Sequence, residues 1–138
     1  MTFKLSKLSQ RRLVGVHPNL VRVVSLAITF TPIDFSVVEG LRTLNRQKYL
    51  YRIGKSRTMN SRHLIGHAVD LGPWVGGKIL WDDGPHWMEL SQAVKRAASM
   101  CSVNIQWGFD LWGWDKPHWQ IVFIPAPNHS PDTAPTDR

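Results

Sequence analysis

The chain has 138 residues, which is enough for one domain with a single hydrophobic core. Its 43% hydrophobic and 20% charged residues are typical of a globular protein and exclude a chain that is disordered throughout. Because the chain has only one cysteine, an intrachain disulfide and a cysteine-rich zinc site are excluded. The formal net charge is +7, and the positive charge is concentrated in residues 1–62, which hold 12 of the 17 Lys and Arg residues.

The first part of the chain predicts two helices and a buried strand. A short apolar-periodic run follows Ser9. A second helix is expected to begin at Pro18, because proline suits the first helical position, and to end before Pro32. Residues 35–39 are rich in β-branched side chains, which predicts a buried strand.

The middle of the chain predicts a third helix and a basic loop. We expect residues 43–53 to form the helix, with Leu44 and Tyr51 facing the core. Residues 54–62 combine small, polar and basic side chains and are expected to form an exposed loop.

The remainder predicts short strands around one long helix. Asp83 is the expected N-cap of this helix, which should run to about Ser102 with Cys101 on its apolar face. A loop rich in Trp, Gly and Asp covers residues 109–117. The expected strands are residues 67–74, 78–81, 103–108 and 118–123, the first two joined by the Gly76-Gly77 turn.

This order of elements is typical of a small single α+β domain, with a short antiparallel sheet flanked by helices. We expect the domain to cover residues 1–124. Residues 125–138 contain four prolines and no large apolar residue, which predicts a disordered tail. The first twenty residues lack a signal-peptide pattern, and the apolar stretch near the start is too short to span a membrane, so we expect no stable membrane insertion.

Two segments carry the residues of a catalytic metal site. Residues 61–70 read Ser-Arg-His-Leu-Ile-Gly-His-Ala-Val-Asp, and residues 115–119 read Asp-Lys-Pro-His-Trp. A catalytic zinc ion takes about three protein ligands and keeps one position for water. The candidate ligands are His63, Asp70 and His118. The alternative is that these are unrelated polar residues, each with its own hydrogen bonds.

The spacing of these residues predicts a turn between the first two ligands. His63 and Asp70 are seven residues apart, which would put them on opposite faces of one regular strand. Gly66 allows the chain to turn between a loop that holds His63 and a strand that holds Asp70. His118 then comes from the neighbouring final strand. His67 is the competing ligand, because it could share a helix face with His63, although Gly66 argues against a helix there.

Asp115 is the candidate general base for the attacking water, because the turn at residues 115–117 lets it reach the same site as His118. Asp110 is the alternative carboxylate, and Asp115 could also be an ordinary turn residue.

Arg42 follows the predicted strand at residues 35–39. Its guanidinium could bind a substrate carboxylate or stabilise an oxyanion, or it could form a salt bridge with Glu39.

The Ser-x-His-x-x-Gly-x-x-x-Asp pattern, followed by Asp-x-x-His, resembles the LAS-type zinc peptidases, and Gly-Leu-Arg-Thr at residues 40–43 matches their upstream arginine motif. The resemblance covers residues 8–124. It implies the hedgehog-like fold of these peptidases, with the zinc site on the sheet. It assigns zinc binding to His63, Asp70 and His118, catalysis to Asp115 and Arg42, and substrate binding or site organisation to Ser61 and Arg42.

One position departs from the family pattern. Gln120 stands two residues after the last ligand, where an acidic residue is expected. This substitution puts a hydrogen bond to the ligand histidine in question, but not the metal.

Within this group, a short chain without signal peptide, anchor or wall-binding domain is most similar to bacteriophage endolysins that cleave between L-alanine and D-glutamate. The implied substrate is the peptidoglycan stem peptide, cut by a zinc-activated water. We expect synthesis in the host cytoplasm, action on the wall after a holin permeabilises the membrane, and a monomer. One alternative is a D,D-carboxypeptidase or dipeptidase, and a second is a non-catalytic basic binding protein of the same fold.

The basic half of the chain fits an enzyme that approaches an anionic envelope. Charge alone does not distinguish a solvated basic face from attraction to nucleic acid, an anionic membrane surface or a cell-wall polymer. No zinc-finger or RNA-binding signature accompanies the charge, so we expect no nucleic-acid partner.

Overall fold

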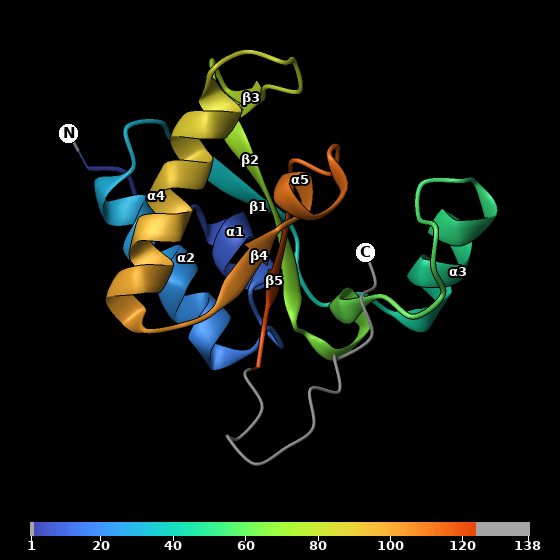
Figure 1. The fold of residues 1–138 in the computed structure, drawn as a ribbon. Coiled ribbons are helices and arrows are strands. Elements are labelled where there is room, and N and C mark those ends of the chain that lie inside the picture. Colours follow the sequence, from blue (N-terminus) through green and yellow to red (C-terminus); the bar gives the residue numbers. More distant parts are fainter. Residues whose placement is uncertain (1, 124–138) are drawn as a thin grey trace.

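The structure is a computed structural model that describes residues 2–123 (Figure 1). The expected tail and the expected domain end at residue 124 lie outside the described residues. The helices are α1 (Lys7–Arg12), α2 (Pro18–Phe30), α3 (Leu44–Arg52), the 3-10 helix η1 (Arg62–Ile65), α4 (His86–Cys101) and α5 (Gly108–Trp112). The strands are β1 (Phe35–Glu39), β2 (Ala68–Val75), β3 (Lys78–Ile79), β4 (Ile105–Trp107) and β5 (His118–Ile121).

The strands form one antiparallel sheet in the order β1-β2-β5-β4, and β3 pairs with the end of β2. Helices α2 and α4 pack together on one side of the sheet, whereas α3 stands apart on the other side (Figure 1). The expected α+β class is therefore confirmed. No helix within residues 2–123 is long and apolar enough to cross a lipid bilayer.

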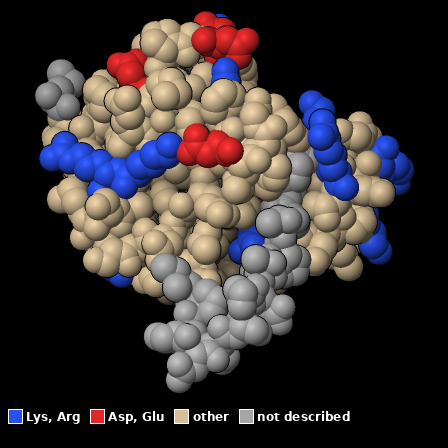
Figure 2. Space-filling model, viewed as in Figure 1, with Lys and Arg blue, Asp and Glu red and all other residues tan. Residues whose placement is uncertain are grey.

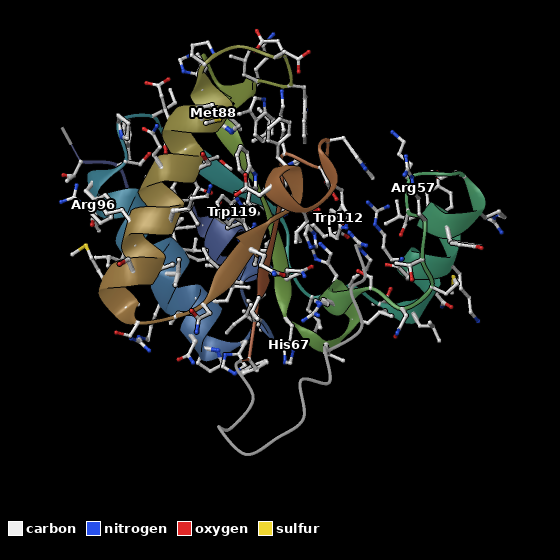
Figure 3. The ribbon with its side chains drawn as sticks, in the orientation of Figure 1. Arg57, His67, Met88, Arg96, Trp112 and Trp119 are labelled. Carbon is white, nitrogen blue, oxygen red and sulfur yellow. The ribbon has the colours of Figure 1, made fainter. Side chains whose placement is uncertain are left out.

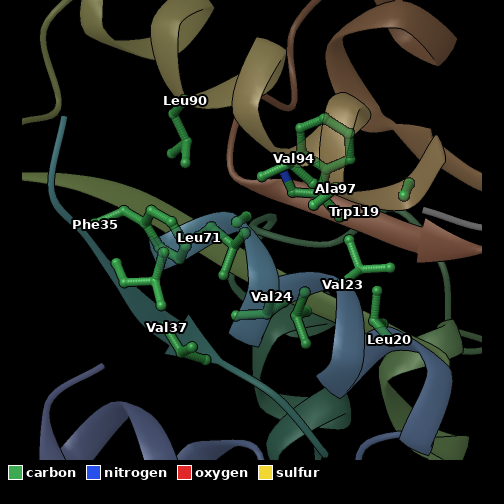
Figure 4. Close-up of a cluster of buried hydrophobic side chains, with 14 of the residues drawn as sticks. Leu20, Val23, Val24, Phe35, Val37, Leu71, Leu90, Val94, Ala97 and Trp119 are labelled. Carbon is green, nitrogen blue, oxygen red and sulfur yellow. The ribbon is translucent and has the colours of Figure 1, made fainter. Parts of the chain in front are cut away.

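The hydrophobic core lies between the sheet and helices α2 and α4 (Figure 4). Burying one valine, leucine or phenylalanine side chain stabilises the fold by about 1.5–3 kcal/mol relative to leaving it exposed. The fully or nearly fully buried members include Leu20, Val23 and Val24 of α2, Leu90, Val94 and Ala97 of α4, and Phe35, Val37, Leu71 and Trp119 of the sheet.

The opposite face of the central strands is polar. Val69 pairs with Trp119 across β2 and β5, and both side chains belong to the core. Because successive side chains of a strand point to opposite faces, the next pair, Asp70 and His118, lies on the face that the core does not use. The alternation of the sequence thus places two candidate ligands side by side.

Two expectations about helix boundaries are wrong. Helix α4 begins at His86, and Asp83 does not cap it. The Asp83 carboxylate instead accepts from Lys116 Nζ at 2.8 Å. The expected loop at residues 109–117 begins with the short helix α5, whose five residues give too little sequence for a helical period to be recognised.

The orientation expected for α3 is also wrong. Leu44 and Tyr51 are 53% and 49% exposed, and the buried side chains are Gln47 and Leu50. The reason is that α3 packs against the loop that follows it rather than against the sheet. The Gln47 amide donates to Ser56 Oγ at 2.9 Å and to the Thr58 carbonyl at 2.6 Å.

Candidate metal centre

His63 is held by the short helix η1, which begins and ends with local signals. The Ser61 hydroxyl accepts a hydrogen bond from the backbone N–H of His63 at 3.2 Å, and so caps the helix. Gly66 ends it in the left-handed conformation, with φ +74°. The His63 carbonyl accepts from the backbone N–H of Arg42 at 2.9 Å. The predicted turn between His63 and Asp70 is confirmed.

The three candidate ligands converge as predicted. His63 Nε2 lies 3.1 Å from Asp70 Oδ1, and His118 Nδ1 lies 3.5 Å from the same oxygen. One donor atom from each of the three residues lies within 4.8 Å of the other two. Ligand atoms bound tetrahedrally at about 2.0–2.1 Å from zinc lie about 3.3 Å apart. The donor atoms and their spacing therefore fit a zinc ion with little rearrangement.

Hydrogen bonds on the far side of each imidazole orient the donor nitrogens. His63 Nδ1 lies 2.9 Å from the Gly40 carbonyl oxygen, and His118 Nε2 lies 2.9 Å from Gln120 Oε1. Because both partners are acceptors, each of these nitrogens carries a proton, and the other ring nitrogen, which faces Asp70, is the one left to bind either a proton or a metal ion. The Gln120 amide in turn donates to Gln106 Oε1 at 3.1 Å. The hydrogen bond questioned from the sequence is therefore present, made by glutamine.

The Asp70 carboxylate and the neighbouring His118 stabilise each other's charged forms. Burial opposes ionisation of Asp70, but the charges and hydrogen bonds of His63 and His118 outweigh it and hold the pKa of Asp70 well below its usual range. Burial alone would lower the pKa of His118, yet its contact with Asp70 and the nearby charge of Asp115 raise it. The Asp70 carboxylate thus attracts positive charge to this site, whether from a proton or a cation.

The ligands form the floor of a pocket of about 270 Å³. Acidic, basic and aromatic side chains share its lining. The lining residues are Glu39, Arg42, Arg46, Leu50, Lys55, Ser56, His63, Asp70, Trp81, Trp114, Asp115 and His118.

Asp115 reaches this pocket, whereas Asp110 does not. The Asp115 carbonyl accepts from the backbone N–H of His118 at 3.3 Å, so the two residues share one turn. Gly108 allows this turn to lie close to the end of β4, because a Cβ atom there would collide with the Asp115 carbonyl. Asp110 is not among the residues that line the pocket and forms an ion pair with Lys95 at 2.7 Å. The geometry therefore favours Asp115 as the carboxylate beside the metal site.

Arg42 has both of the features expected from the sequence, a salt bridge with Glu39 and a position at the pocket. Its guanidinium is nearly buried, donates to Glu39 Oε1 at 2.7 Å and to Gln47 Oε1 at 2.8 Å, and lies 3.7 Å from Asp70 Oδ2. Arg42 thus makes the salt bridge with Glu39 and also lines the pocket. Burial opposes ionisation of Glu39, but the hydrogen bond and the charge of Arg42 outweigh it and keep the pKa of Glu39 below its ordinary value.

His67 lies outside the ligand group. Its ring centroid is 5.6 Å from that of His17 and 5.1 Å from that of Phe123. Burial and the positive charges of His17 and Arg62 lower the pKa of His67. Figure 3 shows His67 at the lower end of the sheet, away from Trp112, whose ring lies 5.4 Å from that of His118.

Several pocket residues were not found from the sequence. Trp81 and Trp114 follow β3 and α5, and Arg46 and Lys55 come from α3 and the loop after it. The abundance of tryptophan between residues 74 and 119 was the available signal for the first two. No pattern in the sequence marks Arg46 or Lys55, because exposed basic residues are common on any surface.

Comparisons with known proteins show which family the chain resembles. The model of the phage L-alanyl-D-glutamate peptidase family matches residues 1–121. The L-alanyl-D-glutamate peptidase of Escherichia phage T5 is 31% identical over 113 residues, 80% of this chain and 82% of that protein. The enzyme of the same name from Listeria phage A118 is 32% identical over 92 residues, 66% of this chain and 31% of that protein.

A solved structure of an enzyme with the same named activity has a similar fold. The L-Ala D-Glu endopeptidase ChiX of Serratia marcescens superposes with a TM-score of 0.80 at 40% sequence identity. The match covers 89% of this chain and 91% of that one.

Proposed function

Because the chain belongs to the phage L-alanyl-D-glutamate peptidase family, we propose that it hydrolyses the bond between L-alanine and D-glutamate in peptidoglycan stem peptides. The observation that carries the proposal is the convergence of His63, Asp70 and His118 on the floor of a pocket that Asp115 also lines. The names of the phage T5 and Serratia relatives supply the bond that is cleaved.

The cofactor proposed for this site is zinc. Two imidazoles and one carboxylate are a usual ligand set for catalytic zinc, and no cysteine competes with them at the site. His63, Asp70 and His118 would hold the ion. When bound, zinc lowers the pKa of water and polarises a carbonyl oxygen.

In this proposal Asp115 is the general base. Its carboxylate takes one proton from the attacking water as the new C–O bond forms at the L-alanyl carbonyl carbon. As the C–N bond breaks, the same group returns the proton to the departing amino group of D-glutamate. The water is thereby divided between the new carboxyl and amino termini, and Asp115 ends in its starting state.

Arg42 and Ser61 have supporting roles in the proposed mechanism. The Arg42 guanidinium contributes positive charge to the pocket, where negative charge develops on the substrate oxygen. Ser61 acts by capping η1, which fixes the backbone of His63. The capping contact supports the role of Ser61 in organising the site over direct binding of substrate.

The cellular setting proposed for this activity is that of an endolysin. The protein is made in the host cytoplasm as a monomer and reaches the cell wall after a holin permeabilises the membrane. Peptidoglycan is its partner, and no nucleic acid is involved. The names of the phage relatives support the assignment to phage.

Digestion of purified peptidoglycan tests the proposal. The zinc-loaded protein should release new amino termini on D-glutamate and new carboxyl termini on L-alanine, identified by mass spectrometry. Treatment with a chelator should stop the reaction, and zinc should restore it.

Other products would contradict the proposal in different ways. Release of terminal D-alanine would indicate the carboxypeptidase alternative. Binding to peptidoglycan with zinc present but no new termini would indicate a non-catalytic protein.

A further inference from the structure

The pocket around the metal centre has two different sides. The side formed by α3 and the loop after it contributes Arg46, Lys55 and the buried Ser56. The loops that follow β3 and α5 contribute Trp81 and Trp114, both partly exposed. Arg57, from the same loop as Lys55, lies over the Trp114 ring with its Cζ atom 4.8 Å from the ring centroid, so the two sides are in contact there. A substrate across the metal therefore meets basic groups from the α3 side and the Trp81 indole from the loop after β3.

Among the cations that line the pocket, Lys55 has a distinct position. Arg42 and Arg46 both contact Glu39, at 2.7 and 3.2 Å, so one carboxylate compensates part of their charge. Lys55 has no ion-pair partner among residues 2–123. Its charge is thus available to an anionic group of a ligand.

The loop that carries Lys55 is fixed by buried contacts. The backbone N–H groups of Lys55 and Ser56 both donate to the Leu50 carbonyl, at 2.8 and 3.1 Å. Gln47 joins this loop to Arg42, because its amide binds Ser56 Oγ, the Thr58 carbonyl and the Arg42 guanidinium. The backbone from which the Lys55 side chain extends is therefore held relative to the metal site.

The proposed substrate has an anionic group at a matching place. Glutamate carries two carboxyl groups, and only one of them can continue the peptide chain. The other remains as a free carboxylate, unless it is amidated, on the D-glutamyl residue whose amino group forms the bond that is cleaved. Because the pocket is only about 270 Å³, the residues on either side of that bond are the ones that fill it.

We propose that Lys55 binds the free carboxylate of the D-glutamyl residue and so makes the enzyme select peptides in which this group is not amidated. The substrate then lies with its D-glutamyl side toward the loop that carries Lys55 and its L-alanyl side toward Trp81. This inference rests on the proposed function and adds a specificity determinant and a direction of binding to it.

The test compares two synthetic peptides that differ only in this group, a free carboxylate in one and a primary amide in the other. The zinc-loaded wild-type protein should show a kcat/KM that is about three- to tenfold higher for the acid, as expected for one partly exposed ionic contact. Lys55→Gln should abolish this preference, and Lys55→Glu should reverse it. The preference of the wild type should also shrink as salt is added.

Lys48→Gln is the matched control. Lys48 is exposed on α3, the helix that precedes the loop of Lys55, and its replacement removes the same charge, but it does not line the pocket. This variant should keep the preference for the acid. Melting temperatures of all variants should stay close to that of the wild type, because both lysines are exposed.

Each other result has a definite meaning. If both peptides are cleaved equally, or if Lys55→Gln lowers both rates alike, the assignment of Lys55 is wrong while the proposed peptidase activity stands. If Lys48→Gln removes the preference as fully as Lys55→Gln does, the effect is a general one of net charge. If neither peptide is cleaved, the proposed function fails and the inference fails with it.

Discussion

Histidine residues in this chain differ by what their two ring nitrogens contact. His63 and His118 each have one nitrogen fixed by an acceptor and the other directed at Asp70. His17 Nδ1 instead accepts the backbone N–H of Asn19 at the start of α2, and His86 binds Glu89 within α4. The candidate metal ligands thus differ from the structural histidines in having one ring nitrogen bound to an acceptor and the other directed at Asp70.

Replacing His118 should remove the metal. His118→Ala deletes one of three ligands, and we expect loss of bound zinc and of peptidase activity, because the remaining two donors hold the ion weakly. Elemental analysis of the purified variant measures the metal directly. His67→Ala is the control, since His67 lies outside the ligand group, and it should retain zinc. Full zinc content in His118→Ala would contradict the assignment.

Replacing Asp115 should separate chemistry from metal binding. Asp115→Asn keeps the shape of the side chain but removes the base, so kcat should fall by about 10²–10⁴-fold with zinc content unchanged. Asp110→Asn should have little effect, because Asp110 pairs with Lys95 away from the pocket. A loss of less than about tenfold in Asp115→Asn would show that another group, or water alone, removes the proton.

The affinity for zinc should depend on pH in one direction. The pKa of His118 is raised in the metal-free site, so a proton competes with the metal below that pKa and is displaced when the metal binds. Affinity should therefore rise with pH up to the pKa of His118 and change little above it. Competition with a chromophoric chelator between about pH 5 and 8 measures this, since an unperturbed histidine titrates near 6.5. A flat profile across this range would show that metal binding does not displace a proton from His118.

At the scale of elements, what could be predicted from the sequence depended on where each element packs. The strand that holds Asp70, the neighbouring strand that holds His118 and the turn at Gly66 were all predicted from the sequence. The inward face of α3 was not, because this helix packs on its own loop through Gln47 rather than on the sheet. Lys55 could not be placed at the pocket for the same reason. Sequence patterns thus indicated the ligands but not the walls around them.

The turn at Gly66 should be essential to the metal centre. Ala at this position must adopt a positive φ, which costs about 1–2 kcal/mol, and its Cβ would also collide with the Gly15 carbonyl. We expect Gly66→Ala to lower the free energy of unfolding by about 2 kcal/mol or more and to weaken zinc binding, measured by denaturant titration and chelator competition.

A matched substitution isolates the effect of the collision. Gly76 also has a positive φ, but a Cβ there would meet no atom within 4 Å. Gly76→Ala should therefore cost only the backbone strain and leave zinc affinity unchanged. Equal effects of the two substitutions on zinc affinity would show that the turn does not position His63.

At the scale of the whole molecule, charge and catalytic site are found on the same side. Residues 44–57, which include α3, contain five Lys or Arg residues and no acidic residue. In the face drawn in Figure 2, basic side chains are visible over this part of the protein and no acidic ones accompany them. The pocket opens beside this basic region, so an anionic polymer attracted to α3 is brought close to the metal centre.

This arrangement predicts that salt affects the polymer more than the peptide. Added salt shortens the screening length from about 8 Å at physiological ionic strength to about 3 Å at 1 M, so attraction between α3 and the wall should weaken. Digestion of insoluble peptidoglycan should slow several-fold over this range. Cleavage of a short amidated peptide, which carries little charge for Lys55 to bind, should change much less. A Lys48→Gln/Arg52→Gln double variant removes two of the five basic charges of this region and should reduce the salt effect on the polymer. Neither side chain lines the pocket, so cleavage of the peptide should not change. If the two substrates slow in parallel, salt acts at the metal centre. If neither slows, the basic region is a solvated face with no part in reaching the wall.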